Sequence, residues 1–211
     1  MKPRLSGVLS LGALIGLSPV PGYSHTMVPG LAVRVRVYNY SQASRDALGK
    51  AQKEAGRILA EAGLPTFWVN CLVLESSADS LRDPCREQLG ALDLELRVLP
   101  KPMKTTFYSA ELGFAVAPIL ASVYYDGIMR LATSDAATFE GPILLGCIIA
   151  HELGHLLLGS DSHSTAGIMQ ARLDRGQVRQ ALTGRLSFSR KEAQHMQREV
   201  TARAESQEIH P

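Results

Sequence analysis

The hydrophobic residues of this chain follow two different periodicities. In residues 31–40 valine alternates with arginine, which predicts a β-strand with one buried face and one solvated face. Beyond Ser44, apolar residues recur every three to four positions as far as Ala62, which predicts an amphipathic helix. Ser44 is a suitable N-cap for this helix, and Gly63 together with Pro65 predicts its end.

Further short segments have the composition of strands. They are residues 67–74, 92–99, 111–117 and 121–128, and Pro118 separates the last two. The single tryptophan, Trp68, is expected in the core. The last segment places Tyr124, Tyr125 and Asp126 on a strand, where tyrosines commonly pack.

Helices are predicted in the C-terminal half of the chain. Residues 143–158 are apolar on nearly all sides, begin after a glycine-proline pair and end at Gly159, so we expect a buried helix. Ser189 and Glu192 have the spacing of a capping box and open the other helix. The order of elements predicts an α+β fold with α/β order in a single domain, and the sequence contains no internal repeat.

The buried helix carries the residues that point to a function. His151 and His155 are four positions apart, so both imidazoles project from one helix face and can bind the same metal ion. Glu152 projects toward the open side of such a metal, where a water can sit. Polar side chains on an apolar helix need a partner, and Zn²⁺ matches this set. The segment therefore predicts a zinc site for hydrolysis with Glu152 as the general base.

A third ligand must come from the segment after Gly159. Asp161 and His163 are both within reach of a metal held by the helix, and both side chains can bind zinc. We favour His163, because imidazole is a favourable zinc ligand, and Asp161 can then accept the second N–H of a ligating histidine. The alternative is that Asp161 itself is the third ligand.

The run His-Glu-Leu-Gly-His at 151–155, followed by a glycine, a histidine and a methionine, resembles the metzincin clan of zinc peptidases and most closely its matrixin branch. The resemblance implies a zinc-dependent endopeptidase with His163 as third ligand and Met169 in the turn beneath the metal. It also implies a metzincin-like twisted mixed sheet of about five strands, an active-site helix and a C-terminal helix. In such enzymes an edge strand pairs with extended peptide substrate, and residues 113–117 are the segment expected there.

The resemblance covers about twenty residues and is imperfect. Leu158 occupies the position where the family has a glycine, Gly159 comes one residue later, and position 161 is an aspartate. These departures put the third ligand in doubt. Two other functions remain open on the sequence, namely a zinc-binding module that recognises peptides without cutting them and a zinc hydrolase of a non-peptide bond. The intact Glu152 argues against the binding module.

The N-terminus has the pattern of a secretory signal. Lys2 and Arg4 precede an apolar run over residues 5–17, and small residues at 22–24 suit cleavage. We therefore expect residues 1–24 to be a signal peptide and 25–211 to form the mature domain, secreted or periplasmic. An uncleaved anchor is the alternative.

The charge balance limits the partners of the mature chain. The full sequence of 211 residues holds 22 Lys and Arg and 20 Asp and Glu, and loss of residues 1–24 removes two basic residues only. A mature chain without net charge or a basic run gives no reason to expect nucleic acid. No membrane association is expected after signal removal, and the expected partner is a protein or peptide substrate. The oligomeric state is left open.

The cysteines and remaining histidines are assigned structural or surface positions. Cys71 and Cys85 flank a polar stretch and are expected to form a disulfide in an oxidising compartment. Cys147 lies one turn before His151 and is expected to be a buried small hydrophobe. The three histidines outside the motif are expected to be exposed to solvent; they are His25, His195 and His210.

Overall fold

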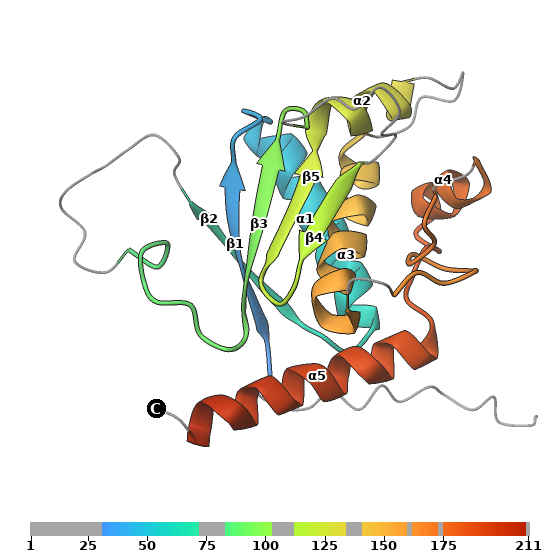
Figure 1. Ribbon diagram of the computed structural model, residues 1–211. Coiled ribbons are helices and arrows are strands. Elements are labelled where there is room, and N and C mark those ends of the chain that lie inside the picture. Colours follow the sequence, from blue (N-terminus) through green and yellow to red (C-terminus); the bar gives the residue numbers. More distant parts are fainter. Residues whose placement is uncertain are drawn as a thin grey trace, which may run out of the picture.

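A twisted five-stranded sheet forms the centre of the computed structural model, which describes residues 31–71, 83–102, 112–133, 141–159, 162–172 and 175–209 (Figure 1). The strands are β1 (Val33–Asn39), β2 (Thr66–Cys71), β3 (Asp93–Leu99), β4 (Gly113–Val116) and β5 (Leu120–Tyr124), in the order β2-β1-β3-β5-β4. All neighbours are parallel except β4, which pairs antiparallel with β5 at the edge. The predicted mixed sheet is confirmed.

Helices α1 and α3 pack side by side on one face of this sheet, and α5 crosses one of its ends (Figure 1). The helices are α1 (Arg45–Glu61), α2 (Tyr125–Thr133), α3 (Gly141–Leu158), α4 (Arg175–Leu182) and α5 (Arg190–Ile209). The valines of β1 face α1 and α3 and are buried. The core therefore lies between the sheet and these two helices.

Helix α1 begins and ends where its sequence predicts. The Ser44 hydroxyl accepts a hydrogen bond from the Ala47 backbone N–H at 3.1 Å, which satisfies one donor of the first turn. Gly63 follows the helix in the left-handed region at φ +79°, a conformation that glycine adopts without strain. The buried face of α1 consists mostly of the apolar residues identified from the periodicity.

Helix α3 is buried along most of its length because a glycine lets α1 approach closely. A Cβ at Gly146 would lie 2.6 Å from the Ala51 carbonyl oxygen of α1, so no larger residue fits there. By length and composition alone α3 could span a membrane, but 78% of it is buried inside the fold. It is the core helix of this domain.

Burial also raises the pKa of the Cys147 thiol on α3 to about 12, so this free cysteine is a neutral core residue, as expected.

The prediction of a strand through residues 125–128 was wrong. The strand β5 ends at Tyr124, and Tyr125 and Asp126 form the first turn of α2. On the β3 side the described residues offer no partner for a longer strand, because β3 ends at Leu99, which pairs with Tyr124, and is followed by Pro100. Helical spacing then buries Ile128 and Ala132, which are four positions apart.

A short helix was missed and the last helix was confirmed. Helix α4 was not predicted, because its eight residues offer only a brief apolar stripe around the buried Val178 and Ala181. Helix α5 opens with the expected capping box, in which the Ser189 N–H donates to the Glu192 carboxylate at 2.6 Å and the Glu192 N–H donates to the Ser189 hydroxyl at 3.3 Å.

One arginine of α5 holds the end of α3 in place. The Arg203 guanidinium donates to the Leu156 carbonyl at 2.6 Å and to the Pro118 carbonyl at 3.1 Å. Leu156 lies in the last turn of α3, where carbonyl groups lack helical partners, and Pro118 lies in the turn between β4 and β5. Arg203 therefore ties α3 to the edge hairpin of β4 and β5.

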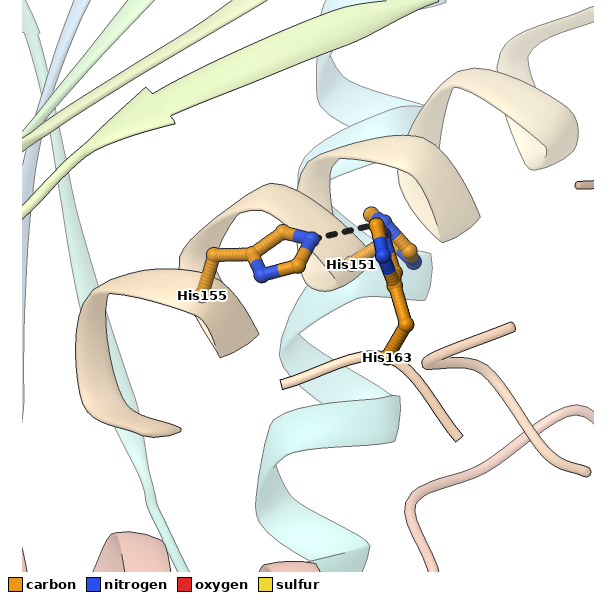
Figure 2. A group of neighbouring side chains, drawn as sticks. All are labelled: His151, His155 and His163. Atoms are coloured by element: carbon orange, nitrogen blue, oxygen red, sulfur yellow. Dashed lines mark hydrogen bonds between the residues drawn. The ribbon is translucent and has the colours of Figure 1, made fainter. Parts of the chain in front are cut away.

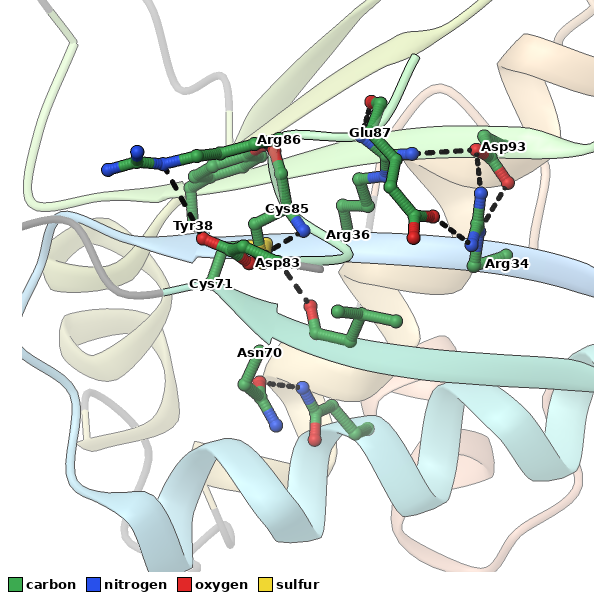
Figure 3. The surroundings of a disulfide bond; sticks show 12 residues. Arg34, Arg36, Tyr38, Asn70, Cys71, Asp83, Cys85, Arg86, Glu87 and Asp93 are labelled. Atoms are coloured by element: carbon green, nitrogen blue, oxygen red, sulfur yellow. Dashed lines mark hydrogen bonds and ion pairs between the residues drawn. A yellow bond between two sulfur atoms is a disulfide. The ribbon is translucent and has the colours of Figure 1, made fainter. Parts of the chain in front are cut away.

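The face of the sheet away from α1 and α3 differs from the prediction. Arg36 on β1 was expected on a solvated face but is only 2% exposed, because residues 83–92 cover it. It donates to Asp93 at 3.0 Å, and Arg34 donates to both oxygens of the same carboxylate at 2.7 and 2.6 Å. Glu87 accepts a further bond from Arg34 at 3.2 Å. We call Arg34, Arg36, Glu87 and Asp93 the arginine cluster (Figure 3).

The covering segment is attached to the sheet by the predicted disulfide. Cys71 at the end of β2 is bonded to Cys85, beside the arginine cluster (Figure 3).

Trp68 is half-buried and packs against the core, which agrees with its expected position. His195 on α5 is exposed as expected. The predicted signal segment 1–24, His25 and His210 lie outside the described residues.

Candidate metal site

The helix α3 brings two imidazoles together as its period requires. The Nε2 atoms of His151 and His155 lie 3.0 Å apart and point toward the same space (Figure 2). His155 is buried at 6% exposure, and His151 is half-buried. Gly159 then ends the helix at φ +99°, a left-handed conformation that turns the chain back toward these rings.

His151 is oriented by a backbone carbonyl. Its Nδ1 lies 2.7 Å from the Ile168 carbonyl oxygen, which can only accept, so Nδ1 carries the hydrogen and Nε2 presents its lone pair. Burial lowers the pKa of His151 to about 4, and this outweighs the Ile168 hydrogen bond, which raises it. The imidazole is therefore neutral near pH 7, which is the form that binds a metal.

His155 is oriented by a side chain on the next loop. Its Nδ1 lies 3.1 Å from the Ser162 hydroxyl oxygen and 3.5 Å from the Gly159 carbonyl oxygen. The Ser162 hydroxyl in turn donates to the Gly159 carbonyl at 2.6 Å. Both histidines of α3 thus use Nδ1 for a protein contact and leave Nε2 directed at the shared space.

The loop after Gly159 adds a third imidazole. The His163 ring centroid lies 4.7 Å from that of His155 and 5.6 Å from that of His151. One ligand atom from each of the three histidines lies within 4.8 Å of the others (Figure 2). His163, the favoured third ligand, is therefore brought to the pair on α3, whereas the alternative Asp161 lies outside the described residues. We call His151, His155 and His163 the histidine cluster.

Met169 packs beneath the segment of α3 that carries the histidines. It is fully buried, and a Cβ at Gly154 would lie 2.7 Å from its sulfur atom and 2.8 Å from the Phe188 ring. Its carbonyl accepts a hydrogen bond from the Ser164 N–H at 2.8 Å, next to His163. Met169 therefore lies where the resemblance expects a methionine, and Gly154 is required for its close approach.

Glu152 faces the edge strand of the sheet. It is 5% exposed, and a Cβ at Gly113 of β4 would lie 2.6 Å from its Oε1 atom. Only a glycine leaves room for the carboxylate at this position, since the same Cβ would also lie 2.6 Å from the Ser122 carbonyl oxygen. Helix α3 thus carries Glu152 and two histidines of the histidine cluster, while β4 contacts Glu152 and the loop after Gly159 supplies His163.

The donor set of the histidine cluster fits Zn²⁺. Zinc binds imidazole nitrogen at about 2.0–2.1 Å in a tetrahedral arrangement, so two ligand nitrogens stand about 3.3 Å apart, close to the separation of the two Nε2 atoms on α3. Three nitrogen ligands leave a fourth position for water, which is typical of catalytic zinc sites. The site has the composition that zinc hydrolysis requires.

Sequence reasoning named the candidate ligands but missed the groups that orient their rings. Nothing in the sequence pointed to the Ile168 carbonyl, because any residue supplies a carbonyl and only the fold selects one. Ser162 was missed as well, although a serine next to a candidate ligand is a signal that spacing alone could have raised. Gly113 gave no signal for its proximity to Glu152, which lies 39 positions away in the chain.

Comparison with known proteins gives matches in structure only. No protein-family model matches the sequence, and no curated protein matches it. An archaemetzincin from Methanopyrus kandleri superposes with a TM-score of 0.56 at 17% identity, over 82% of this chain and 98% of that chain. A zinc-dependent peptidase from Methanocorpusculum labreanum gives a TM-score of 0.54 at 15% identity, over 77% and 99%. The chain therefore has the fold of these zinc peptidases, while its placement in the matrixin branch stays a sequence prediction.

Proposed function

We propose that this protein is a zinc-dependent endopeptidase. The observation that carries the proposal is the convergence of the three imidazoles of the histidine cluster, with Glu152 on the same helix lying against β4 at the edge of the sheet. His151, His155 and His163 are the proposed zinc ligands, and the zinc peptidases that share this fold support the assignment. A binding module would not need a buried carboxylate next to the metal.

In the proposed reaction the protein supplies the base and the orientation. Zn²⁺ bound by the three histidines would lower the pKa of a coordinated water toward about 7 and polarise the scissile carbonyl. Glu152 would act as the general base that accepts a proton from the attacking water and would then donate a proton to the leaving amine. The low exposure of Glu152 keeps bulk water away from its carboxylate during both transfers.

Strand β4 is the proposed site for extended peptide substrate. The Tyr124 N–H donates to the Leu112 carbonyl at 2.8 Å, so these residues form a hydrogen-bonded pair. Hydrogen-bonded and non-bonded pairs alternate in an antiparallel ladder, so the backbone groups of Gly113 and Ala115 point to the free edge. Phe114 and Val116 are 37% and 53% exposed and can contact substrate side chains.

A proline substitution tests this substrate strand. Ala115→Pro removes an N–H that faces the free edge, so we expect KM to rise or cleavage to stop while zinc is retained. Ala115→Gly keeps the N–H and is the matched control. Unchanged kinetics in Ala115→Pro would mean that substrate binds elsewhere.

Export is proposed from the N-terminal signal pattern, with residues 1–24 removed and the mature protein secreted or periplasmic. The Cys71–Cys85 disulfide supports this proposal, because disulfides persist in oxidising compartments. Mass measurement of the exported protein tests it. A product that still begins at Met1 would contradict cleavage and favour an anchor.

The proposed activity is tested by zinc content and cleavage of a broad peptide library, measured on the wild type and on Glu152→Gln. We expect zinc in both proteins, and a kcat about 10²- to 10⁴-fold lower in Glu152→Gln, because the variant lacks the base and keeps every ligand. A chelator should abolish cleavage by the wild type. Zinc without any peptide cleavage would favour a binding module or a hydrolase of another bond, and near-normal turnover of Glu152→Gln would rule out this mechanism.

A further inference from the structure

Ser162 stands between the two parts of the histidine cluster. Helix α3 supplies His151 and His155, and the loop after Gly159 supplies His163. Ser162 immediately precedes His163 on that loop and contacts the His155 ring on the helix at 3.1 Å. Within the described part of this loop, Ser162 is the residue whose side chain forms a hydrogen bond with a histidine side chain of α3.

The hydrogen of the Ser162 hydroxyl is already committed. A hydroxyl has one hydrogen, and this one is directed to the Gly159 carbonyl, 2.6 Å away. Toward His155 the Ser162 oxygen can then only accept, so His155 must carry its hydrogen on Nδ1. The other ring nitrogen, Nε2, is left with a lone pair directed at the shared space.

The neighbouring imidazole needs the same arrangement. His151 donates from Nδ1 to the Ile168 carbonyl, so its Nε2 also presents a lone pair, 3.0 Å from the Nε2 of His155. Two lone pairs directed at one point at this distance attract a cation that accepts both. The alternative tautomer of His155 would place an N–H in the same space and would exclude the metal.

We infer that Ser162 is a positioning residue for the metal site, which selects the metal-binding tautomer of His155 and holds the His163 loop against α3. The inference rests on the proposed zinc site. It differs from the sequence expectation, in which Asp161 was the residue that orients a ligand histidine. Partners of this kind fix ring orientation in metal sites, and their loss typically weakens metal affinity about 10- to 100-fold.

The same loop offers a matched control. Ser164 lies on the other side of His163, and its hydroxyl donates to the Ala166 carbonyl at 2.8 Å. Ser162 and Ser164 are thus both loop serines that donate to a backbone carbonyl, and of the two only Ser162 has a hydrogen bond to a ligand ring. A general effect of losing a loop hydroxyl should be the same at both positions.

Zinc affinity, measured by competition with a chelator of known affinity, tests the inference. We expect Ser162→Ala to raise the zinc Kd about 10-fold or more. Ser162→Thr keeps a hydroxyl and should restore affinity, and Ser164→Ala should bind zinc like the wild type. Equal affinities of Ser162→Ala and wild type would overturn the role of Ser162 and leave the zinc site intact. A wild type that binds no zinc would overturn both the role and the proposed function.

A spectroscopic measurement separates ring orientation from a general loop effect. Long-range proton–nitrogen NMR of the zinc-free protein, at a pH where the imidazoles are neutral, reports which ring nitrogen carries the hydrogen. We expect His155 in the Nδ1–H form in the wild type and in Ser162→Thr, and a mixture of both tautomers in Ser162→Ala. The same single tautomer in Ser162→Ala would show that the serine does not select it.

Discussion

The histidine cluster and the arginine cluster both bring polar side chains together around a buried member, but they differ in how these groups are balanced. In the arginine cluster Asp93 is 5% exposed and accepts from Arg34, from Arg36 and from the Gly90 N–H at 2.9 Å. Opposite charges and backbone carbonyls are supplied within the cluster. In the histidine cluster three imidazoles face one another, and the buried carboxylate of Glu152 lies against β4.

Under the proposed function, this difference separates a structural cluster from a functional one. The arginine cluster pairs opposite charges and contributes to attachment of residues 83–92 to the sheet, although the buried Arg36 Nε atom has no hydrogen-bond partner among the described residues. The histidine cluster instead directs the Nε2 atoms of His151 and His155 at one space, which a cation would complete under the proposed function. The two clusters are distinguished by the directions of their hydrogen-bond donors and acceptors, and not by the number of charges alone.

The largest effect is expected from variants that remove an imidazole from the histidine cluster. His155→Ala and His163→Ala should each lose zinc and, with it, hydrolysis, because two imidazoles form an incomplete site. Asp161→Ala should weaken zinc affinity only about 10- to 100-fold if Asp161 acts on a ligand rather than on the metal. Metal retention through dialysis, followed by zinc analysis, measures the ranking. The reverse order would make Asp161 the third ligand and would cast doubt on the placement of Met169.

Breaking the arginine cluster should change stability and leave zinc binding unchanged. Asp93→Asn removes the carboxylate shared by Arg34 and Arg36, and Arg36 at 2% exposure has no access to water. Loss of one partner of a buried pair costs about 3 kcal/mol or more, so the free energy of unfolding should fall by that amount. Urea unfolding checks this value, and zinc affinity is the control. A stability loss under about 1 kcal/mol would show that the carbonyl contacts of Arg36 suffice.

The smallest expected effect is a pH dependence of the arginine cluster. Burial by itself raises the pKa of Asp93, but the hydrogen bonds from Arg34 and Gly90 and the charges of Arg34 and Arg36 outweigh it and hold the pKa below 3.8. A carboxylate with a lowered folded pKa stabilises the fold above its unfolded pKa of about 3.9, and this contribution is lost as the pH falls through the folded pKa.

The stability difference between wild type and Asp93→Asn should therefore be constant near neutral pH and shrink below about pH 4. Both proteins are measured with chelator present, so that zinc release in acid does not contribute. A difference that persists to the lowest pH at which the wild type stays folded would assign the stabilisation to packing rather than to charge.

Local patterns allowed much of the fold to be predicted. The Ser44 cap, the capping box at Ser189, and the buried helix ending at Gly159 follow from rules that act within a few residues, and all three are found. The strand predicted through residue 128 failed because a strand needs a partner, and the partner β3 ends at Leu99. Arg36 was assigned to solvent because the chain that covers it lies about fifty positions away.

For the candidate site, the sequence by itself determined what one helix can determine. A period of 3.6 residues brings His151 and His155 onto one face and turns Glu152 away from them, whatever surrounds the helix. Only the tertiary structure decided that His163 reaches this pair, that Ile168 and Ser162 orient the rings, and that Gly113 lies against Glu152. These contacts depend on the path of loops and on the edge of a sheet, and no periodicity in the chain encodes such distances.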